Sequence, residues 1–300
     1  MRTTKRFTPQ VLARFQNKER GTGTHEHYAP WHQVTRGDPA SGGRSHLVAW
    51  RGRLRHFLSD GELDQQLFAA MLPDLFDALE QHPLSVNGER HPLTAYTNPA
   101  EPTEEFPGTL QIAAQLGIKH PLCRGHGQTS EWTLSTDLLL VLKERAGTHT
   151  MLALAFKPRN WAEKRRTTEL LTIEREYWTA RGVEWLLICP TLYDRATSLF
   201  LRRTACWALV DPVETTLLDQ AAQTAINHPS NSVTSLLNLI SSSATIDIST
   251  AQRALWQAVW QGRLPIDLRR SWRPHYPLRL LSHKEFWSLN PIAARRSAWT

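Results

Sequence analysis

Apolar and polar residues in the middle of the chain are arranged as strands flanked by helices. Two apolar runs, residues 134–142 and 151–156, are separated by the polar, glycine-containing segment KERAGTHT. Short apolar runs bounded by turn residues predict a strand, a turn and a second strand. Pro158 ends the second strand because proline has no amide hydrogen to donate. A charged amphipathic helix over residues 161–181 and a buried strand, VEWLLIC, follow. This β-β-α-β order indicates an α/β core.

Shorter elements are predicted nearer the N-terminus. The segment TPQVLARFQNKER carries its apolar residues at helical spacing and predicts an amphipathic helix. The segment SHLVAWRGRLRHFLSD predicts a hairpin, with its turn near Arg51–Arg53, that leads into a second helix. Ser59 and Glu62 have the spacing of a capping box, in which each side chain bonds the backbone amide of the other residue. We therefore expect that helix to begin at Ser59.

The later segments predict a loop, a short helix and a second domain. A polar, proline-rich stretch from about 85 to 107 is typical of a long loop, and GTLQIAAQLGI predicts a short helix closed by Gly117. After Asp211 the chain is rich in alanine, threonine and leucine and is predicted to be helical. We therefore predict two domains, residues 1–210 and 211–300.

Composition excludes several classes of protein. The apolar fraction of 41% and charged fraction of 21% are ordinary for a globular protein, and no apolar run approaches the roughly 20 residues of a membrane helix. The start, MRTTKRF, is not followed by the apolar stretch of a secretory signal, so we expect a bacterial cytoplasmic location. Cys123, Cys189 and Cys206 are widely spaced, which argues against disulfides and a zinc site and favours buried thiols.

Charge is distributed unevenly along the chain. Residues 1–60 carry 11 Lys+Arg against 4 Asp+Glu, residues 61–250 carry 15 against 22, and residues 251–300 carry 9 against 2. Basic ends beside an acidic centre indicate polyanion-binding surfaces around a cation-binding site. Solvated surface charge with no ligand is the alternative.

Glu62, Asp137 and Lys157 are the candidate catalytic residues. Phosphodiester hydrolysis needs a cation, an activated water and a positive group near the developing charge, and magnesium prefers carboxylate and carbonyl oxygens. Asp137 begins one predicted central strand and Lys157 follows the next, so a hairpin brings them to one edge of the sheet. Each residue also has a structural interpretation, in which Asp137 caps a turn, Lys157 marks a strand end and Glu62 is only a helix cap.

The chain resembles the TnsA endonuclease family in several short blocks that occur in the family's order. The blocks are YAPW at 28–31, SGGRSH at 41–46, FLSDGEL at 57–63, DALEQHPL at 77–84, GIKHP at 117–121, STD at 135–137, FKP at 156–158 and IEREYW at 173–178. Each block is short, but their collinear order is hard to obtain by chance.

This resemblance implies a fold and a set of site residues. It implies a type II restriction-endonuclease-like core with a smaller helical, winged-helix-like C-terminal domain. It further implies two Mg²⁺ ions, for which Mn²⁺ would substitute, held by Glu62 and Asp137 with the Phe156 carbonyl as a third ligand. Lys157 matches the active-site lysine, and Glu174 matches a further acid whose alternative role is a surface pair with Lys or Arg on its helix.

The chain departs from the family's pattern at several positions. Ala155 stands two residues before Lys157, where restriction-like nucleases usually have Glu, Asp or Gln, so it can supply no ligand. Leu79 replaces an expected basic residue in the DALEQHPL block, and the loop near 85–107 is longer than usual. The C-terminal third matches poorly, so its assignment rests on order and composition.

Other polar and aromatic residues are candidates for binding rather than chemistry. The histidines lack the spacing of a zinc site, and His120 and Arg124 are expected at the edge of the active site or against the DNA backbone. Trp256 and Trp260 have the i, i+4 spacing of a buried helix face. The C-terminal arginines are predicted to contact either DNA or a protein partner. They include Arg269, Arg270 and Arg273.

The resemblance predicts an endonuclease that cuts the 5′ ends of a transposon. Its expected partners are double-stranded DNA at the transposon ends, a TnsB-type integrase and a TnsC-type AAA+ ATPase regulator, with no membrane. Two alternatives are a catalytically inactive DNA-binding subunit that links integrase and ATPase, with which Ala155 is compatible, and a stand-alone restriction or repair nuclease. The retained Glu62, Asp137 and Lys157 favour an active enzyme over the inactive subunit.

Overall fold

The computed structural model describes residues 6–38, 43–96, 104–144, 147–158, 160, 164–270 and 272–299. It contains two compact units. Unit 1 comprises the described residues of Met1–Leu63, Asp74–Cys189 and Ala298–Thr300, and unit 2 comprises those of Asp64–Pro73 and Pro190–Ser297. Helix α2 (Asp60–Ala70) contributes to both units, because its first residues, 60–63, belong to unit 1 and the others to unit 2.

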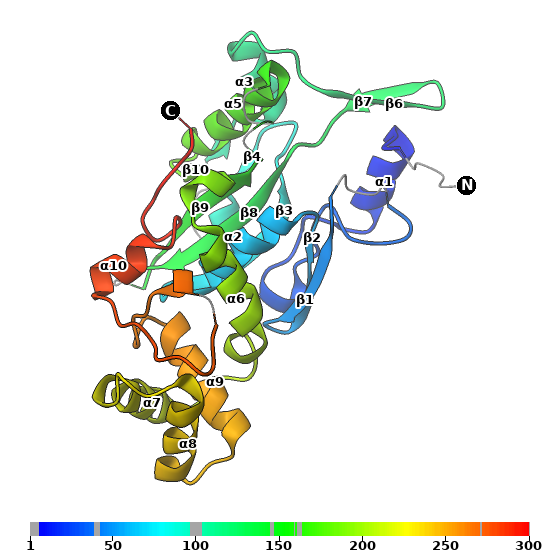
Figure 1. Ribbon diagram of the computed structural model, residues 1–300. Helices are drawn as coiled ribbons and strands as arrows, with labels where there is room; N and C mark the ends of the chain where they lie inside the picture. Colours follow the sequence, from blue (N-terminus) through cyan, green and yellow to red (C-terminus); the bar gives the residue numbers. More distant parts are fainter. Residues whose placement is uncertain are drawn as a thin grey trace. The chain divides into compact units, whose positions relative to one another are not determined.

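A four-stranded sheet forms the centre of unit 1 (Figure 1). Its strands are β3 (Leu75–Pro83), β8 (Ser135–Lys143), β9 (His149–Phe156) and β10 (Glu184–Ile188), in the order β10-β9-β8-β3. β10 pairs with β9 in parallel, and the β9–β8 and β8–β3 pairs are antiparallel. The sheet confirms the predicted hairpin and the strand VEWLLIC, which become β8, β9 and β10.

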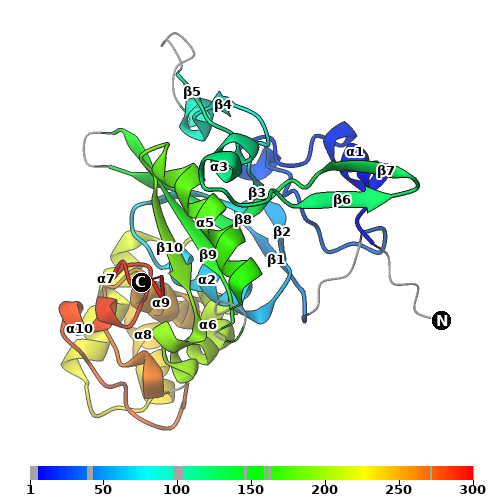
Figure 2. The same cartoon turned by 90° about the horizontal axis from the view of Figure 1, so that it is seen from above.

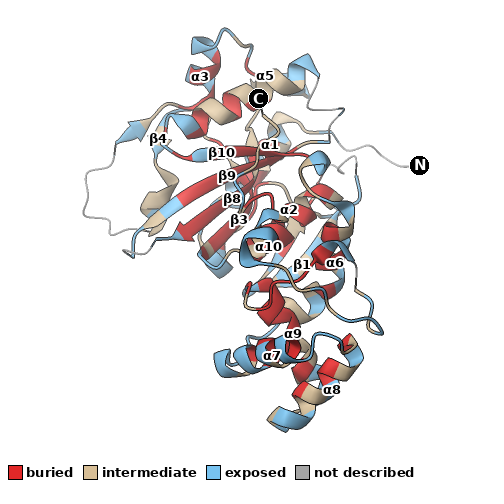
Figure 3. Ribbon diagram, turned by 60° about the vertical axis from the view of Figure 1, so that its left-hand side comes forward, coloured by how far each residue is buried: buried red, intermediate tan, exposed pale blue. Residues whose placement is uncertain are grey.

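Helix α5 (Arg165–Thr179) connects β9 to β10 and covers one face of the sheet together with α3 (Thr109–Gln115) (Figure 2). The predicted helix started at residue 161, but residues 161–163 lie outside the described residues. Leu139 and Val141 of β8, Ala153 and Ala155 of β9, and Ile173, Tyr177 and Trp178 of α5 belong to one buried cluster. Figure 3 shows β8 and β9 as buried along most of their length. Unit 1 therefore has an α/β core, as predicted.

Smaller elements surround the sheet. They are α1 (Pro9–Asn17), η1 (His25–His27), β1 (His46–Trp50), β2 (Arg53–Phe57), β4 (Glu89–Arg90), η2 (Pro92–Tyr96), β5 (Glu105–Phe106), β6 (Leu122–Gly125) and β7 (Gln128–Glu131). The α1 helix and the β1–β2 hairpin confirm the predictions. The described part of the stretch 85–107 was predicted as a loop, but it contains the β4–β5 pair and η2. The predictions also omitted the β6–β7 hairpin.

Strand β3 was not predicted, because its sequence does not look like a buried strand. Asp77, Glu80 and Gln81 are at most 2% exposed although they are polar or charged, and the strand therefore lacks an apolar run. The hydrogen-bond partners of these buried polar side chains come from distant segments, which a local sequence pattern does not reveal. The omission matters because β3 lies beside β8, the strand that carries Asp137.

Unit 2 is helical. Its helices after α2 are η3 (Pro190–Leu192), α6 (Arg195–Ala208), α7 (Thr215–Asn227), α8 (Val233–Ala244), α9 (Ile248–Trp260), η4 (Leu268–Arg270) and α10 (His283–Ser288). Trp256 and Trp260 are buried, as their spacing predicts. In the described part of unit 2, β structure is limited to two isolated bridges, so the predicted winged-helix-like character has no specific support.

The compact units do not coincide with the predicted division at residue 210. Unit 2 already includes Pro190, because α6 packs against α9. Two of the cysteines, Cys123 and Cys189, are buried as expected, whereas Cys206 on α6 is exposed. Within the described ranges, no helix is both long and apolar enough to cross a membrane.

Candidate active site

Glu62 lies in the first turn of α2, close to the end of β9. The preceding residue, Gly61, allows this approach, because a Cβ atom at position 61 would lie 1.8 Å from the Phe156 ring. Such a separation is far below van der Waals contact, so any side chain larger than hydrogen would push the helix start away from the strand. Gly61 in the FLSDGEL block therefore brings Glu62 to the edge of the sheet where β9 ends.

The carboxylate of Glu62 is held by the start of its own helix. Ser59 Oγ accepts a hydrogen bond from the Glu62 amide (3.2 Å) and donates one to Glu62 Oε1 (3.0 Å). Glu62 Oε2 accepts from the Leu58 amide at 2.8 Å, one residue before the amide that a capping box would use. One half of the predicted capping box is thus present, the bond from the Glu62 amide to Ser59 Oγ. In the other half, the Glu62 carboxylate accepts from the Leu58 amide instead of the Ser59 amide.

Asp137 and Lys157 meet at the same edge of the sheet, as their positions on a hairpin predict. Asp137 Oδ2 accepts from the Phe156 amide (2.7 Å) and from Lys157 Nζ (3.2 Å). Lys157 Nζ also donates to the Phe156 carbonyl at 2.7 Å. Asp137 is 13% exposed and Lys157 is 29% exposed in their side chains, so the pair is reachable from solvent.

Gln81 joins the two acidic residues, although a glutamine at this position is not predicted as a site residue. Its Nε2 donates to Glu62 Oε2 at 3.0 Å and to Asp137 Oδ1 at 3.5 Å. Ser135 Oγ donates to Gln81 Oε1 at 3.4 Å. The only available signal was its place in the DALEQHPL block, which the family resemblance already marked.

Burial and mutual repulsion set the electrostatics of this cluster. Burial, and then the Asp137 charge, raise the pKa of the Glu62 carboxyl from 4.5 to about 7. Burial lowers the pKa of the Lys157 ammonium, but the charges of Asp137, Glu174 and Glu62 together raise it above its ordinary value. Lys157 is therefore charged at neutral pH, and the acidic cluster carries more negative charge than this single ammonium balances.

Glu174 lies inside unit 1, so its alternative assignment as a surface helix pair is wrong. It is 6% exposed, and its Oε1 accepts from Thr136 Oγ1 (2.9 Å) and from Trp185 Nε1 (3.2 Å). Burial, followed by the Asp137 charge, raises its pKa to about 7. Thr136 precedes Asp137 on β8, so Glu174 braces the strand that carries the catalytic candidate.

His120 and Arg124 are not joined to the acidic cluster by any contact within the described ranges. The His120 ring is buried, with Nε2 3.1 Å from Thr109 Oγ1 and Nδ1 3.1 Å from the Pro121 carbonyl. Burial lowers its pKa. Both ring nitrogens thus have protein partners, which is typical of a core histidine. Arg124 is exposed on β6, where it can reach a ligand.

The donor set fits a hard divalent cation. Two carboxylates and the Phe156 carbonyl are oxygen ligands of the kind magnesium prefers. Burial, and then the Asp137 charge, raise the pKa of Glu62, and a cation beside both carboxylates would favour its ionised form. In the described part of the chain, no group of three or more His, Cys, Asp or Glu side chains is placed to hold a metal ion. Carbonyl, water and phosphate oxygens would therefore complete the shell, as magnesium usually requires.

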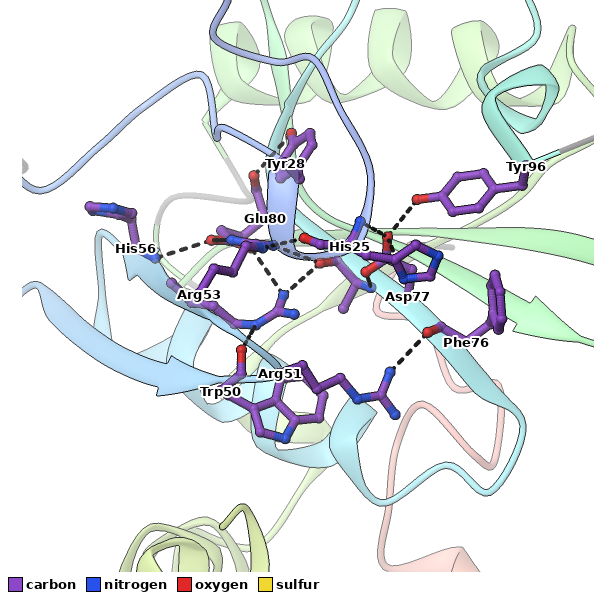
Figure 4. Close-up of polar contacts among 12 residues, drawn as sticks. His25, Tyr28, Trp50, Arg51, Arg53, His56, Phe76, Asp77, Glu80 and Tyr96 are labelled. Atoms are coloured by element: carbon purple, nitrogen blue, oxygen red, sulfur yellow. Dashed lines mark hydrogen bonds and ion pairs between the residues drawn. The ribbon is translucent and has the colours of Figure 1, made fainter. Parts of the chain in front are cut away.

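A second polar cluster on β3 lies next to Gln81 and holds the β1–β2 hairpin (Figure 4). Glu80 is fully buried and accepts from Arg53 Nη1 and Nη2 at 2.5 and 2.6 Å, a bidentate pair. Arg55 Nη1 (3.3 Å) and the His56 amide (3.2 Å) also donate to it. The donors to the nearby Asp77 are the His25 amide, the Ala78 amide and Tyr96 Oη. These arginines are bound internally and do not form the DNA-binding surface that the basic N-terminal segment suggested.

The C-terminal arginines of unit 2 differ in their availability. Arg269 donates from Nε and Nη2 to the two Asp267 oxygens at 2.7 and 3.1 Å. Arg270 and Arg273 are exposed, and Arg273 lies over the Tyr276 ring at 5.8 Å. Of the three predicted arginines, only Arg270 and Arg273 are therefore free of an ion pair among the described residues.

Comparisons with known proteins support the sequence resemblance. Residues 100–189 match the family model of the TnsA-like endonuclease N-terminal domain. The chain is 32% identical over 183 residues, 60% of its own length, to the transposon Tn7 transposition protein TnsA of Escherichia coli. The matched part spans 57% of that relative's length. Asp137, Lys157 and Glu174 lie within residues 100–189, the part of the chain that matches the family model.

Proposed function

We propose that this chain, which belongs with the TnsA family by these similarities, is a DNA endonuclease subunit of a cut-and-paste transposase. In this proposal it hydrolyses phosphodiester bonds at the 5′ ends of the transposon. The observation that carries the proposal is the convergence of Glu62 on α2, Asp137 on β8 and Lys157, just after β9, at one edge of the sheet. Gln81 links the Glu62 and Asp137 carboxylates there. Structural caps and strand ends, the alternative for each residue alone, do not require this convergence.

The proposed cofactor is Mg²⁺, with two ions by family resemblance and Mn²⁺ as a substitute. Glu62, Asp137 and the Phe156 carbonyl would hold it. When bound, the cation neutralises phosphate charge and lowers the pKa of a water molecule. We also propose that the α/β core of unit 1 has the type II restriction-endonuclease-like fold, in which such a site is expected by family resemblance.

Lys157 has one donor left for the substrate. An ammonium group has three N–H donors, and two of them are used by Asp137 Oδ2 and the Phe156 carbonyl. The third can reach a phosphate oxygen or the attacking water, where its positive charge stabilises the developing negative charge. Asp137 holds the ammonium in place, and the antiparallel pairing of β8 with β9 brings the two residues together.

The proposed partners come from the same family resemblance. They are double-stranded DNA at the transposon ends, a TnsB-type integrase that processes the 3′ ends, and a TnsC-type AAA+ ATPase regulator. The alternative functions are an inactive assembly subunit, which is compatible with Ala155 because this residue is fully buried and supplies no ligand, and a stand-alone restriction-like nuclease.

Cleavage of a donor plasmid in the presence of the integrase and magnesium tests the proposal. We expect Asp137→Ala and Asp137→Asn to abolish 5′-strand cutting while both bind transposon-end DNA. The Asn variant keeps an oxygen acceptor for the Phe156 amide and so separates loss of charge from loss of structure. Asp219→Asn, at an exposed ion pair with Arg263 in unit 2, is the matched control. Normal cutting by Asp137→Asn would overturn the active-site assignment, and no cutting by the parent would favour the inactive subunit.

A further inference from the structure

Gln81 has an unusual backbone for a residue inside a strand. Its φ is 51°, in the left-handed region that residues with a Cβ atom rarely adopt. The β3–β8 register continues on both sides, with Glu80 opposite Leu138 and His82 opposite Thr136. Strained conformations of this kind cost free energy and are concentrated at functional sites. The strain at Gln81 therefore needs a reason beyond strand formation.

Neighbouring segments hold this conformation in place. The Trp31 amide donates to the Gln81 carbonyl at 3.2 Å, and Tyr28 Oη donates to the Glu80 carbonyl at 3.3 Å. Both donors belong to the YAPW block. On the other side, Glu80 is fixed by Arg53 and the hairpin (Figure 4). The backbone at position 81 is thus over-determined by its surroundings, as a maintained outlier requires.

The side chain of Gln81 is also fixed in orientation. Its Nε2 faces two carboxylates, which accept hydrogen bonds but cannot donate them when ionised. Its Oε1 accepts from the Ser135 hydroxyl. A reversed amide would place an oxygen against two carboxylate oxygens, so the contacts select a single orientation.

Counting acceptor sites shows what this arrangement leaves open. An ionised carboxylate offers about four lone-pair positions. Glu62 uses two on Oε2, for Leu58 and Gln81, and one on Oε1, for Ser59. Asp137 uses two on Oδ2 and one, for Gln81, on Oδ1. Each carboxylate keeps a free position, and among the described residues Gln81 is the side chain that donates to both.

We propose that Gln81 is a positioning residue that fixes the separation of Glu62 and Asp137 for a divalent cation. This inference rests on the proposed function, since it assumes a metal-dependent site. The amide satisfies both carboxylates on one side and leaves their remaining lone pairs to a cation on the other. It also supplies, from β3, a polar side chain beside Asp137 that Ala155 of β9 does not supply.

Two substitutions separate this role from a purely structural one. Gln81→Met keeps the length of the side chain but removes both donors, so the carboxylates lose their common anchor. Gln81→Glu keeps the length of the side chain but adds a third negative charge. This charge destabilises the metal-free protein and increases the stabilisation that a bound cation provides. Gln257→Met is the matched control, because Gln257 is a buried glutamine in unit 2 that bonds only backbone groups among the described residues.

The measurement is the melting temperature of the full chain as a function of magnesium chloride, starting from EDTA. We expect Gln81→Met to need about 10- to 100-fold more magnesium for half of the melting-temperature rise, the usual effect of losing a residue that orients metal ligands. Gln81→Glu should melt below the parent in EDTA and show a larger rise with magnesium. Gln257→Met should lower the melting temperature equally with and without magnesium.

The outcomes distinguish this inference from the proposed function. If the parent shows a magnesium-dependent rise and folded Gln81→Met shows it at the same concentrations, the positioning role is overturned while the metal site stands. If neither the parent nor Gln81→Glu responds to magnesium, and Asp137→Asn behaves like the parent, the metal-dependent site itself is wrong. A larger response of Gln81→Glu, lost when Asp137→Asn is added, supports both.

Discussion

Replacing Glu62 with Gln separates the cost of burying its charge from the benefit of its hydrogen bonds. In the parent, Oε2 accepts from the Leu58 amide and Gln81 Nε2, and Oε1 accepts from Ser59 Oγ. A glutamine carbonyl in place of Oε2 can accept the first two bonds. Its amide nitrogen in place of Oε1 can donate to Ser59 Oγ, so the pattern survives with one bond reversed.

The magnitude follows from the pKa of the Glu62 carboxyl. Burial and the Asp137 charge raise it from 4.5 to about 7, so the folded state binds this proton more tightly than the unfolded state. The contribution of Glu62 to stability is therefore fully present below pH 4.5 and is lost as the pH rises through about 7. At about 1.4 kcal/mol per pH unit, this interval costs the parent up to about 3 kcal/mol above pH 7. Glu62→Gln carries no such cost.

Urea unfolding in EDTA between pH 4.5 and 8 is the assay. We expect Glu62→Gln to match the parent within about 1 kcal/mol at the acidic end. At pH 8 it should be more stable by up to about 3 kcal/mol, yet lose DNA cleavage. Ser59→Ala is the control for the cap, with a loss of about 1 kcal/mol at pH 4.5 and cleavage retained. Its loss should grow as the pH rises, because the Ser59 hydroxyl donates to the Glu62 carboxylate and lowers its pKa. If Glu62→Gln is less stable than the parent at pH 8, the carboxylate is a stabilising charge and the reasoning fails.

Two further predictions concern charges outside the active site. Glu80→Gln should lower the free energy of unfolding by about 3–5 kcal/mol, because it leaves two buried arginines without their counter-charge. Asp219→Asn at the exposed pair should cost less than about 1 kcal/mol, and equal losses in urea titrations would refute this contrast. Replacing Arg270 and Arg273 with Gln should flatten the salt dependence of DNA binding by up to about two units, at 0.9 per phosphate. If the salt dependence of DNA binding keeps its slope while binding to the ATPase is lost, this surface binds protein instead of DNA.

The centre of the fold was predictable from sequence because its signals are local. The two apolar runs of β8 and β9, the turn between them and Pro158 each act over a few residues. Their pairing then brings Asp137 and Lys157 together without further information. Local reading also placed the start of α2 correctly, because Ser59 Oγ does accept from the Glu62 amide.

Local reading failed where distant residues decide the outcome. The same S-x-x-E spacing forms a complete capping box at Ser282 and Glu285, whereas Glu62 bonds the amide before Ser59. Unlike Glu285, Glu62 also accepts a hydrogen bond from Gln81, on the distant strand β3. The sequence alone leaves Glu174 undecided between site and surface for the same reason, because its hydrogen-bond partners, Thr136 and Trp185, lie on other elements. Polar residues buried by long-range pairing carry no periodic signal.

Charge counts are informative about DNA binding only after internal pairs are removed. The basic segment 1–60 holds 11 Lys+Arg, but Arg53 and Arg55 are buried on Glu80, and Arg20 is buried on Asp38. A buried, paired guanidinium contributes little to the field that attracts a polyanion, because its counter-charge lies at hydrogen-bonding distance. The N-terminal excess of positive charge is therefore partly structural: it fastens the β1–β2 hairpin to β3 and so supports the strand on which Gln81 bridges the two carboxylates.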